Sequence, residues 1–210
     1  MDVAVTGATG FVGRAVVRAL LARGDHVRAL SRSPDSIAPE PGVRAMPFDP
    51  AGDVDPAPFE GADAVIHLAG ETVAGRWTDA KRQAIRESRV RGTGLVVDSI
   101  AACTGKPKVL VCASAVGYYG DRACEPLLES SAPGPDFLAD VCVGWEAQAQ
   151  RAQSFGLRAA WLRQGLVFGV GGGALAQMVP PFRAFAGGPF GNGSQWIPWI
   201  HIDDATALFL

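Results

Sequence analysis

The sequence lacks the stretches that would tie the protein to a membrane or to nucleic acid. None of its apolar runs approaches the roughly 18 residues that a membrane-spanning helix needs. It has no basic run and no alternation of basic with aromatic residues, and its net charge of −2 argues against a nucleic acid partner. The chain enters a strand-like run at once, without a basic segment or a cleavage signal. We therefore expect a soluble, cytoplasmic protein without a secretory leader.

Cysteine is scarce and scattered, at positions 103, 112, 124 and 142, with no CxxC pair and no zinc-like spacing. Zinc sites and disulfide frameworks need regularly spaced ligands, so we expect free thiols and no metal site. Hydrophobic residues make up 48% of the chain and charged residues 19%, a composition that can bury a sizeable core. The 210 residues suffice for one large domain, or for one domain and part of a second.

Glycine is abundant, with 26 residues, and its most informative cluster lies near the N-terminus. Gly7, Gly10 and Gly13 follow the β-branched run 2–6 and precede an apolar periodic run, 14–21, that predicts a helix. A tight turn between a strand and a helix directs backbone N–H groups and the positive end of the helix dipole at one point, which suits a pyrophosphate. The spacing is GxxGxxG rather than GxGxxG, and such a corner can be purely structural. The dinucleotide interpretation therefore depends on the rest of the chain.

Apolar strand-like runs alternate with helical patterns along most of the chain. We expect further strands at 26–30, 43–49, 63–70, 108–114 and 157–163, and helices at 78–104 and 136–155. Continuous apolar strands that alternate with helices predict an α/β fold, a doubly wound parallel sheet of the Rossmann type covered on both faces. In such a sheet, ligands bind beyond the carboxyl ends of the strands, where the strand order reverses.

The pattern changes toward the end of the chain. We expect glycine-rich loops at 169–173 and 187–193, followed by an extended segment at 196–202. A new helix is expected to begin after Asp203, which would be its N-cap. We therefore expect a dinucleotide-binding domain over residues 1–165 and the beginning of a substrate-side cap over residues 166–210. The last helix is cut off in mid-pattern, so we expect most of this cap to be absent.

The end of the second expected strand indicates which nucleotide binds. An NAD-preferring site usually carries Asp or Glu about 20 residues after the glycines, where it holds the ribose 2′-OH. Here the position reads Ser31-Arg32-Ser33. A 2′-phosphate prefers a planar bidentate donor and hydroxyls, so Ser31 and Arg32 predict NADP, with Arg14 as an added charge; otherwise Arg32 is a solvated loop residue. Asp49, after the third strand, either accepts a hydrogen bond from the adenine amino group or caps the following turn.

Several motifs resemble the extended or atypical branch of the short-chain dehydrogenase/reductase superfamily. Residues 6–13 are similar to the cofactor fingerprint of that branch, and residues 67–70 to its loop after the fourth strand. More specific segments resemble the epimerase-family, YfcH-like subgroup, which is often described as sugar-nucleotide epimerase-like: Leu68–Glu71, Arg76–Trp77, Glu87–Arg89, Ser114–Gly120, Trp145–Glu146 and Trp199–Asp204. The resemblance covers essentially the whole chain.

The resemblance implies an NADP-binding Rossmann domain with oxidoreductase or epimerase activity on an undefined small polar carbonyl or sugar nucleotide. It places the cofactor on the glycine turn and on the loop after the fourth strand, that is, on Gly7, Thr9, Gly10, Phe11, Val12, Gly13, Leu68, Ala69, Gly70, Glu71 and Arg76. Glu71 is expected near a ribose hydroxyl and Arg76 near phosphate oxygens; the alternative is a surface ion pair between them. A small-molecule substrate and a second copy of the chain, forming a homodimer, are the expected partners.

The catalytic residues of the superfamily are only partly present. Its chemistry uses a tyrosine as general acid/base, a lysine four residues later that lowers the pKa of the tyrosine, and a serine that orients the substrate oxygen. Ser114 matches the serine, whereas Leu138 and Cys142 stand where the tyrosine and the lysine are expected. Two functions therefore stay open: an NADP-dependent enzyme, and an NADP-sensing protein that kept the fold and lost the dyad.

Substitutes for the missing dyad lie close to Ser114 in the sequence. Tyr118 and Tyr119 follow it in a loop expected to face the nicotinamide, and either is a candidate acid if Arg76 or Arg89 lies near it. The alternative is that the two tyrosines only pack the loop. Cys142 is a candidate nucleophile or proton donor, or simply a core thiol.

Overall fold

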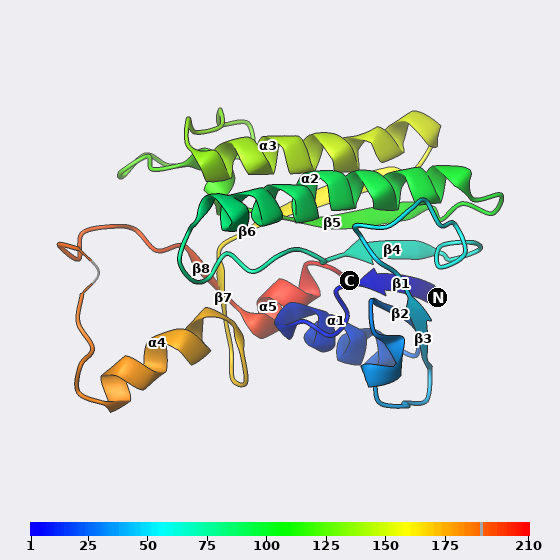
Figure 1. Cartoon of the computed structure of the whole chain (residues 1–210), viewed down its shortest axis with the longest axis horizontal. Helices are drawn as coiled ribbons and strands as arrows, with labels where there is room; N and C mark the ends of the chain where they lie inside the picture. Colours follow the sequence, from blue (N-terminus) through cyan, green and yellow to red (C-terminus); the bar gives the residue numbers. More distant parts are fainter. Residues whose placement is uncertain (190) are drawn as a thin grey trace.

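The computed structural model describes residues 1–189 and 191–210 and is organised around a six-stranded parallel sheet (Figure 1). Its strand order is β3-β2-β1-β4-β5-β6, so that the order along the chain reverses between β1 and β4. Parallel strands need crossover connections, which helices supply here on both faces. This is the doubly wound α/β fold that the alternating pattern predicts. The reversal marks the crevice where ligands of such sheets bind.

The first half of the sheet is formed by β1 (Asp2–Thr6), β2 (His26–Ser31) and β3 (Val43–Pro47), with α1 (Phe11–Ala22) as the first crossover. The bounds of β1 are those expected from the sequence. The helix begins at Phe11 rather than at Arg14, because the residues of the glycine motif themselves form its first turn. A short 3-10 helix, η1 (Pro34–Ser36), interrupts the expected loop between β2 and β3.

The second half of the sheet contains β4, β5 and β6, connected by the two longest helices. The elements are β4 (Ala64–His67), α2 (Asp79–Ala102), β5 (Val109–Ala115), η2 (Val116–Tyr119), α3 (Phe137–Gln150), η3 (Arg151–Phe155) and β6 (Arg158–Gln164). Both long helices begin at a capping side chain, because Thr78 and Asp136 each accept a hydrogen bond from a backbone N–H three residues on. The helix expected over 136–155 is thus divided into α3 and η3.

Helices cover both faces of the sheet, with α2 and α3 on one side and α1 and α5 on the other (Figure 1). Under α2, the fully buried Phe59, Val96 and Ile100 form one core with the strands. Under α1, Val16 and Leu20 form a second core with the opposite face of the strands. The central strands are therefore buried on both sides, which explains their nearly continuous apolar sequence.

The last part of the chain contains two elements that the sequence pattern does not predict. These are β7 (Leu166–Phe168) and α4 (Gly173–Arg183), which are followed by β8 (Trp199–His201) and α5 (Ile202–Ala207). Strands β7 and β8 pair in parallel as a small second sheet. Helix α4 buries none of its residues and extends away from the main sheet (Figure 1). The expected glycine-rich loop 187–193 includes position 190, which lies outside the described residues.

Helix α5 returns to the main body of the molecule. It packs against α1, and Phe209 just beyond it is buried in the same core as Val16. The side chain that caps α5 is His201, whose Nδ1 accepts a hydrogen bond from Asp203 N, so the expectation that Asp203 is the N-cap is wrong. The division of the chain after residue 165 stays a prediction. In the described part of the chain, no helix combines the length and the apolar character that crossing a membrane requires.

Candidate functional site

The glycine turn leaves the N-terminus of α1 open. Its N-cap is Gly10, which offers no capping side chain, and its first turn carries no acidic residue. The first backbone N–H groups of a helix have no partner within the helix, so they and the positive end of the dipole are available to an anion. Helices α2 and α3, by contrast, are capped by their own side chains. The geometry of α1 therefore suits a phosphate.

Close packing explains why Gly7 and Gly13 are glycines. Gly7 has a φ of +69°, and a Cβ there would lie 2.8 Å from Ala69 N. A Cβ on Gly13 would lie 2.1 Å from Gly7 O. Any larger residue would separate α1 from the turn, or the turn from the loop that follows β4. Gly13 thus allows α1 to pack directly against the glycine turn, although it does not line a cavity.

A buried polar group fixes these two loops to each other. Thr6 Oγ1 accepts hydrogen bonds from Leu68 N (3.2 Å) and Ala69 N (3.3 Å), and it lies 2.6 Å from His67 Nδ1. On the other side of the ring, His67 Nε2 lies 2.9 Å from Thr93 Oγ1 on α2. His67 is completely buried, and its burial lowers its pKa to about 4. The neutral ring therefore holds the carboxyl ends of β1 and β4 in register.

A cavity of about 460 Å³ lies at the reversal point, between the glycine turn and the loop after β4. It brings together residues that are far apart in the sequence and that were expected at the cofactor: Gly7, Thr9, Gly10, Ser31, Arg32, Leu68, Ala69, Gly70 and Glu71. We call it the first cavity. Its position is the one that the fold predicts for a ligand.

The end of β2 presents hydroxyls and a cation to the first cavity. Ser31, Arg32, Ser33 and Ser36 all line it. Ser31 Oγ accepts a hydrogen bond from Ser33 N at 3.1 Å, which shapes the turn beside Arg32. No acidic residue follows β2 at the position where an NAD site would carry one.

Four residues that were expected to contact the cofactor do not line the first cavity. Arg14 donates to Thr9 O from outside the lining of the first cavity. Asp49 is exposed, and its carboxylate accepts a hydrogen bond from Ala51 N at 3.0 Å, so it caps the turn after β3. Phe11 and Val12 line a neighbouring cavity rather than the first one.

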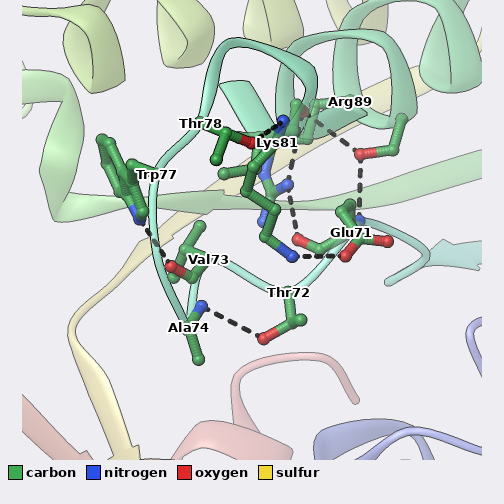
Figure 2. Close-up of polar contacts among 10 residues, drawn as sticks. Glu71, Thr72, Val73, Ala74, Trp77, Thr78, Lys81 and Arg89 are labelled. Carbon is green, nitrogen blue, oxygen red and sulfur yellow. Dashed lines mark hydrogen bonds and ion pairs between the residues drawn. The ribbon is translucent and has the colours of Figure 1, made fainter. Parts of the chain in front are cut away.

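Arg76 is exposed and lines neither cavity. The alternative of a surface ion pair between Glu71 and Arg76 is wrong, because Glu71 pairs with Lys81 instead, at 2.6 Å. Figure 2 shows this pair bridging the loop after β4 and the start of α2. The hydrogen bond from Lys81 holds the pKa of the Glu71 carboxyl below its usual value, and the nearby Arg32 and Arg89 add to the effect.

The second cavity, of about 960 Å³, lies beside the first and shares Gly70 and Glu71 with it. Its walls come from the start of α1, the loop after β4, β7 and α4, and Arg89 of α2 also lines it. The unpredicted α4 therefore contributes to the site through Met178 and Phe182. A ligand held in the first cavity can extend past Gly70 into the second.

The candidate catalytic residues form a buried polar network at the ends of β5 and β6. Ser114 Oγ donates to Glu146 Oε1 at 2.6 Å, and Arg163 donates to both carboxylate oxygens of Glu146 at 2.8 Å. Arg163 Nη1 also donates to the hydroxyl of Tyr119 at 3.0 Å, and its guanidinium lies 3.4 Å from the ring centre of Tyr118. The cation beside the two tyrosines is thus Arg163, not Arg76 or Arg89 as expected.

Sequence reasoning missed Arg163. The signal that could have found it is a charged residue near the carboxyl end of β6, the end of the strand where ligands of such sheets bind. The hydrogen bonds to Glu146 raise the pKa of Arg163, which keeps it charged.

The positions of the missing dyad face the interior. Leu138 lies next to Gly117, and Cys142 is buried, with 3% of its surface exposed. Burial raises the pKa of Cys142 to about 11, and the charge of Glu146 adds to the effect. The thiolate is the nucleophilic form, so Cys142 is a core thiol rather than a nucleophile at neutral pH.

All four cysteines are free thiols. Within residues 1–189 and 191–210, no group of three or more His, Cys, Asp or Glu side chains is placed to hold a metal ion.

Together, the strand order, the open N-terminus of α1 and the cavity at the reversal point define a Rossmann fold of the dinucleotide-binding class. The sequence profile described as "NAD dependent epimerase/dehydratase family" matches residues 3–210. The chain belongs to this family, and the resemblance to the extended short-chain dehydrogenases/reductases is confirmed.

Similar proteins are described as epimerase family proteins. The "Epimerase family protein SDR39U1 homolog, chloroplastic" of Arabidopsis thaliana is 42% identical over 220 residues, an alignment that covers 99% of this chain and 61% of the plant protein. The epimerase family protein YfhF of Bacillus subtilis is 35% identical and is covered over 68% of its length, against 99% of this chain.

Solved structures agree with these relatives. The crystal structure of human SDR39U1 (isoform 2) with NADPH has a TM-score of 0.83 and 35% identity, and the match covers 98% of this chain and 68% of the human one. The nucleoside-diphosphate sugar epimerase from Corynebacterium glutamicum has a TM-score of 0.80 and 40% identity, over 100% of this chain and 42% of that one. The chain thus spans about three fifths of the length of the plant relative.

Proposed function

We propose that this protein binds NADP(H) in the first cavity and acts as an oxidoreductase or epimerase of the extended short-chain dehydrogenase/reductase type. Its substrate is a small polar carbonyl compound or a sugar nucleotide. The observation that carries the proposal is the first cavity itself: it opens at the strand reversal, onto a helix N-terminus that no side chain caps.

The residues present fit the cofactor. The backbone N–H groups at the start of α1 and the close turn at Gly7 and Gly10 suit the pyrophosphate, and the loop at Leu68–Glu71 lies along the opposite wall. The bound nicotinamide would supply a hydride acceptor or donor. The 2′-phosphate is assigned to Ser31 and Arg32, because a guanidinium recognises phosphate through two parallel hydrogen bonds. The NADPH in the structure of the human relative supports the same preference.

Cofactor titration tests the proposal. We expect NADPH to bind more tightly than NADH, and Arg32→Ala to weaken NADPH binding by roughly tenfold to a hundredfold, the value of one charged hydrogen-bonded contact. The affinity for NADH is expected to stay unchanged. Arg44→Ala is the matched control, because Arg44 is exposed on β3 and lines neither cavity. Equal affinities for the two cofactors, or an unchanged NADPH affinity in Arg32→Ala, would show that the 2′-phosphate assignment is wrong.

A second candidate function is an NADP-sensing protein without turnover. The geometry around Ser114 favours it, because that hydroxyl donates to a buried carboxylate that Arg163 already neutralises. Under the enzyme hypothesis, Ser114 orients the substrate, and Tyr118 or Tyr119 is the general acid. A screen of carbonyl compounds and sugar nucleotides that follows NADPH absorbance separates the two. Turnover that Ser114→Ala abolishes without weakening NADPH binding supports the enzyme, whereas tight NADPH binding without turnover supports the sensor.

A further inference from the structure

Arg89 is a cation at the edge of the second cavity. The proposed function gives this residue no role. It lies on α2, half-buried, and its guanidinium carbon is 3.5 Å from where a Cβ on Gly70 would lie, at the residue that the two cavities share. Arginine is costly to bury unless its charge and its donors are used. What the guanidinium contacts therefore bears on what the second cavity holds.

Only one edge of the guanidinium is occupied. Arg89 Nη1 donates to Glu71 O at 2.8 Å and, more weakly, to Ile85 O at 3.4 Å (Figure 2). Among residues 1–189 and 191–210, neither Nε nor Nη2 of Arg89 has a hydrogen-bond partner. The group also lies 5.1 Å from the ring centre of Trp145, a cation–π contact that adds to its positioning. A rigid guanidinium with two unused donors is preorganised for a ligand.

The charge of Arg89 is not neutralised either. The carboxylate whose charge acts on Arg89 is that of Glu71, which already pairs with Lys81 at 2.6 Å. Within the described residues, no salt bridge joins Arg89 to an acidic side chain. The carboxylate of Glu71 thus faces three cations, Lys81, Arg32 and Arg89, and of these Arg89 lines the second cavity.

The rest of the second cavity is mainly apolar. Its lining includes Phe11, Val12, Val73, Leu166, Met178 and Phe182. A pocket of this kind holds the uncharged body of a small molecule, while its few polar groups fix the orientation of that molecule. Arg89 is the one cation among the described residues that line it, and the other polar side chains there are those of Glu71, Thr72 and Gln177.

We propose that Arg89 binds a carboxylate or phosphate group of the substrate, so that the second cavity selects anionic substrates. The inference rests on the proposed function in taking this cavity as the substrate site. The planar fork of arginine matches either oxyanion. The other source of such an anion is a phosphate of the cofactor, and the test below distinguishes the two.

The test compares two probes of the same shape, phenylacetate and phenylacetamide, in ligand-observed NMR titrations of the whole protein with and without NADPH. We expect the wild-type protein to bind the carboxylate about tenfold more tightly than the amide, the value of one charged hydrogen-bonded contact. Arg89→Met is expected to bind both probes equally, with its NADPH affinity unchanged. Arg82→Met is the matched control and keeps the preference, because Arg82 is exposed on the same helix and lines neither cavity.

Arg89→Lys is a second variant in case Arg89→Met does not fold, because it keeps the positive charge and loses only the planar guanidinium. It is expected to keep a reduced preference for phenylacetate. Three results would overturn the proposal: no preference in the wild-type protein, a preference that survives in Arg89→Met, or binding of neither probe at millimolar concentration. A loss of NADPH affinity in Arg89→Met with an unchanged probe preference would assign the anion to the cofactor instead. Failure of the wild-type protein to bind NADPH would refute the proposed function alone, since the probes are also titrated without cofactor.

Discussion

The network around Glu146 allows a stability prediction that can be worked out from its contacts. Glu146 and Arg163 have only 8% and 14% of their side-chain surface exposed, and three hydrogen bonds reach the carboxylate, one from Ser114 and two from Arg163. Arg163→Met keeps most of the side-chain volume and removes the charge. The carboxylate of Glu146 then keeps the hydroxyl of Ser114 as its one remaining donor within the network.

A buried charge left without its partner costs about 3–5 kcal/mol of stability. At roughly 2–4 °C per kcal/mol for a protein of this size, the melting temperature is expected to fall by about 6–20 °C. Arg151→Met is the matched control, because the ion pair between Arg151 and Asp98 is exposed, at 47% and 43%. Loss of such a surface pair costs no more than about 1 kcal/mol.

Circular dichroism measures the free energy of unfolding of both variants in urea and their melting temperatures on heating. The double variant Glu146→Gln with Arg163→Met extends the test. It is expected to be more stable than the sum of the two single changes implies, because it leaves no unpaired charge behind. The reasoning is refuted if Arg163→Met is as stable as Arg151→Met, or if the two changes at Glu146 and Arg163 add independently.

Two further predictions concern buried titratable groups. Because the pKa of His67 is about 4 in the fold and its ordinary value is 6.5, the unfolded chain takes up a proton first as the pH falls. The free energy of unfolding is therefore expected to decrease by about 2 kcal/mol between about pH 7 and pH 5, and His67→Gln to lack this part of the decrease in urea titrations at the two pH values. Of the four cysteines only Cys124 is exposed, so a thiol reagent is expected to modify one thiol rapidly in the native protein and none in Cys124→Ser. Rapid modification of Cys142 would contradict its burial.

The fold could be predicted from the sequence because its signals are local and strong. The buried run of β1 and the capping threonine before α2 each fix an element by themselves, and the alternation of strands and helices fixes a parallel sheet. Helix α4 was missed for the opposite reason. It contains Pro180 and Pro181, follows a glycine-rich loop, has no capping side chain at its start and buries no residue, so the usual signals of a helix are missing.

The cofactor side of the site was also largely predictable, because turns at the carboxyl ends of parallel strands must converge. The network around Arg163 was not. Arg163 and Glu146 lie on different elements, and only the packing of α3 against β6 brings the guanidinium to the carboxylate. Arg76 is exposed and lines neither cavity, so its assignment to the cofactor stays a prediction.

The hydrogen-bond directions at Thr6 have a consequence for the chemistry of the cleft. The oxygen of this hydroxyl accepts from Leu68 N and Ala69 N, so its proton is left for His67 Nδ1, and the ring is the tautomer that carries its hydrogen on Nε2. Protonation of Nδ1 would set two hydrogens against each other and force the hydroxyl to turn. The bond from Leu68 N to the backbone oxygen of Thr6, at 3.2 Å, does not depend on the hydroxyl and would keep the loop after β4 beside the glycine turn. The hydroxyl that sets the tautomer of His67 is thus the same one that joins β1 to the loop that lines the first cavity.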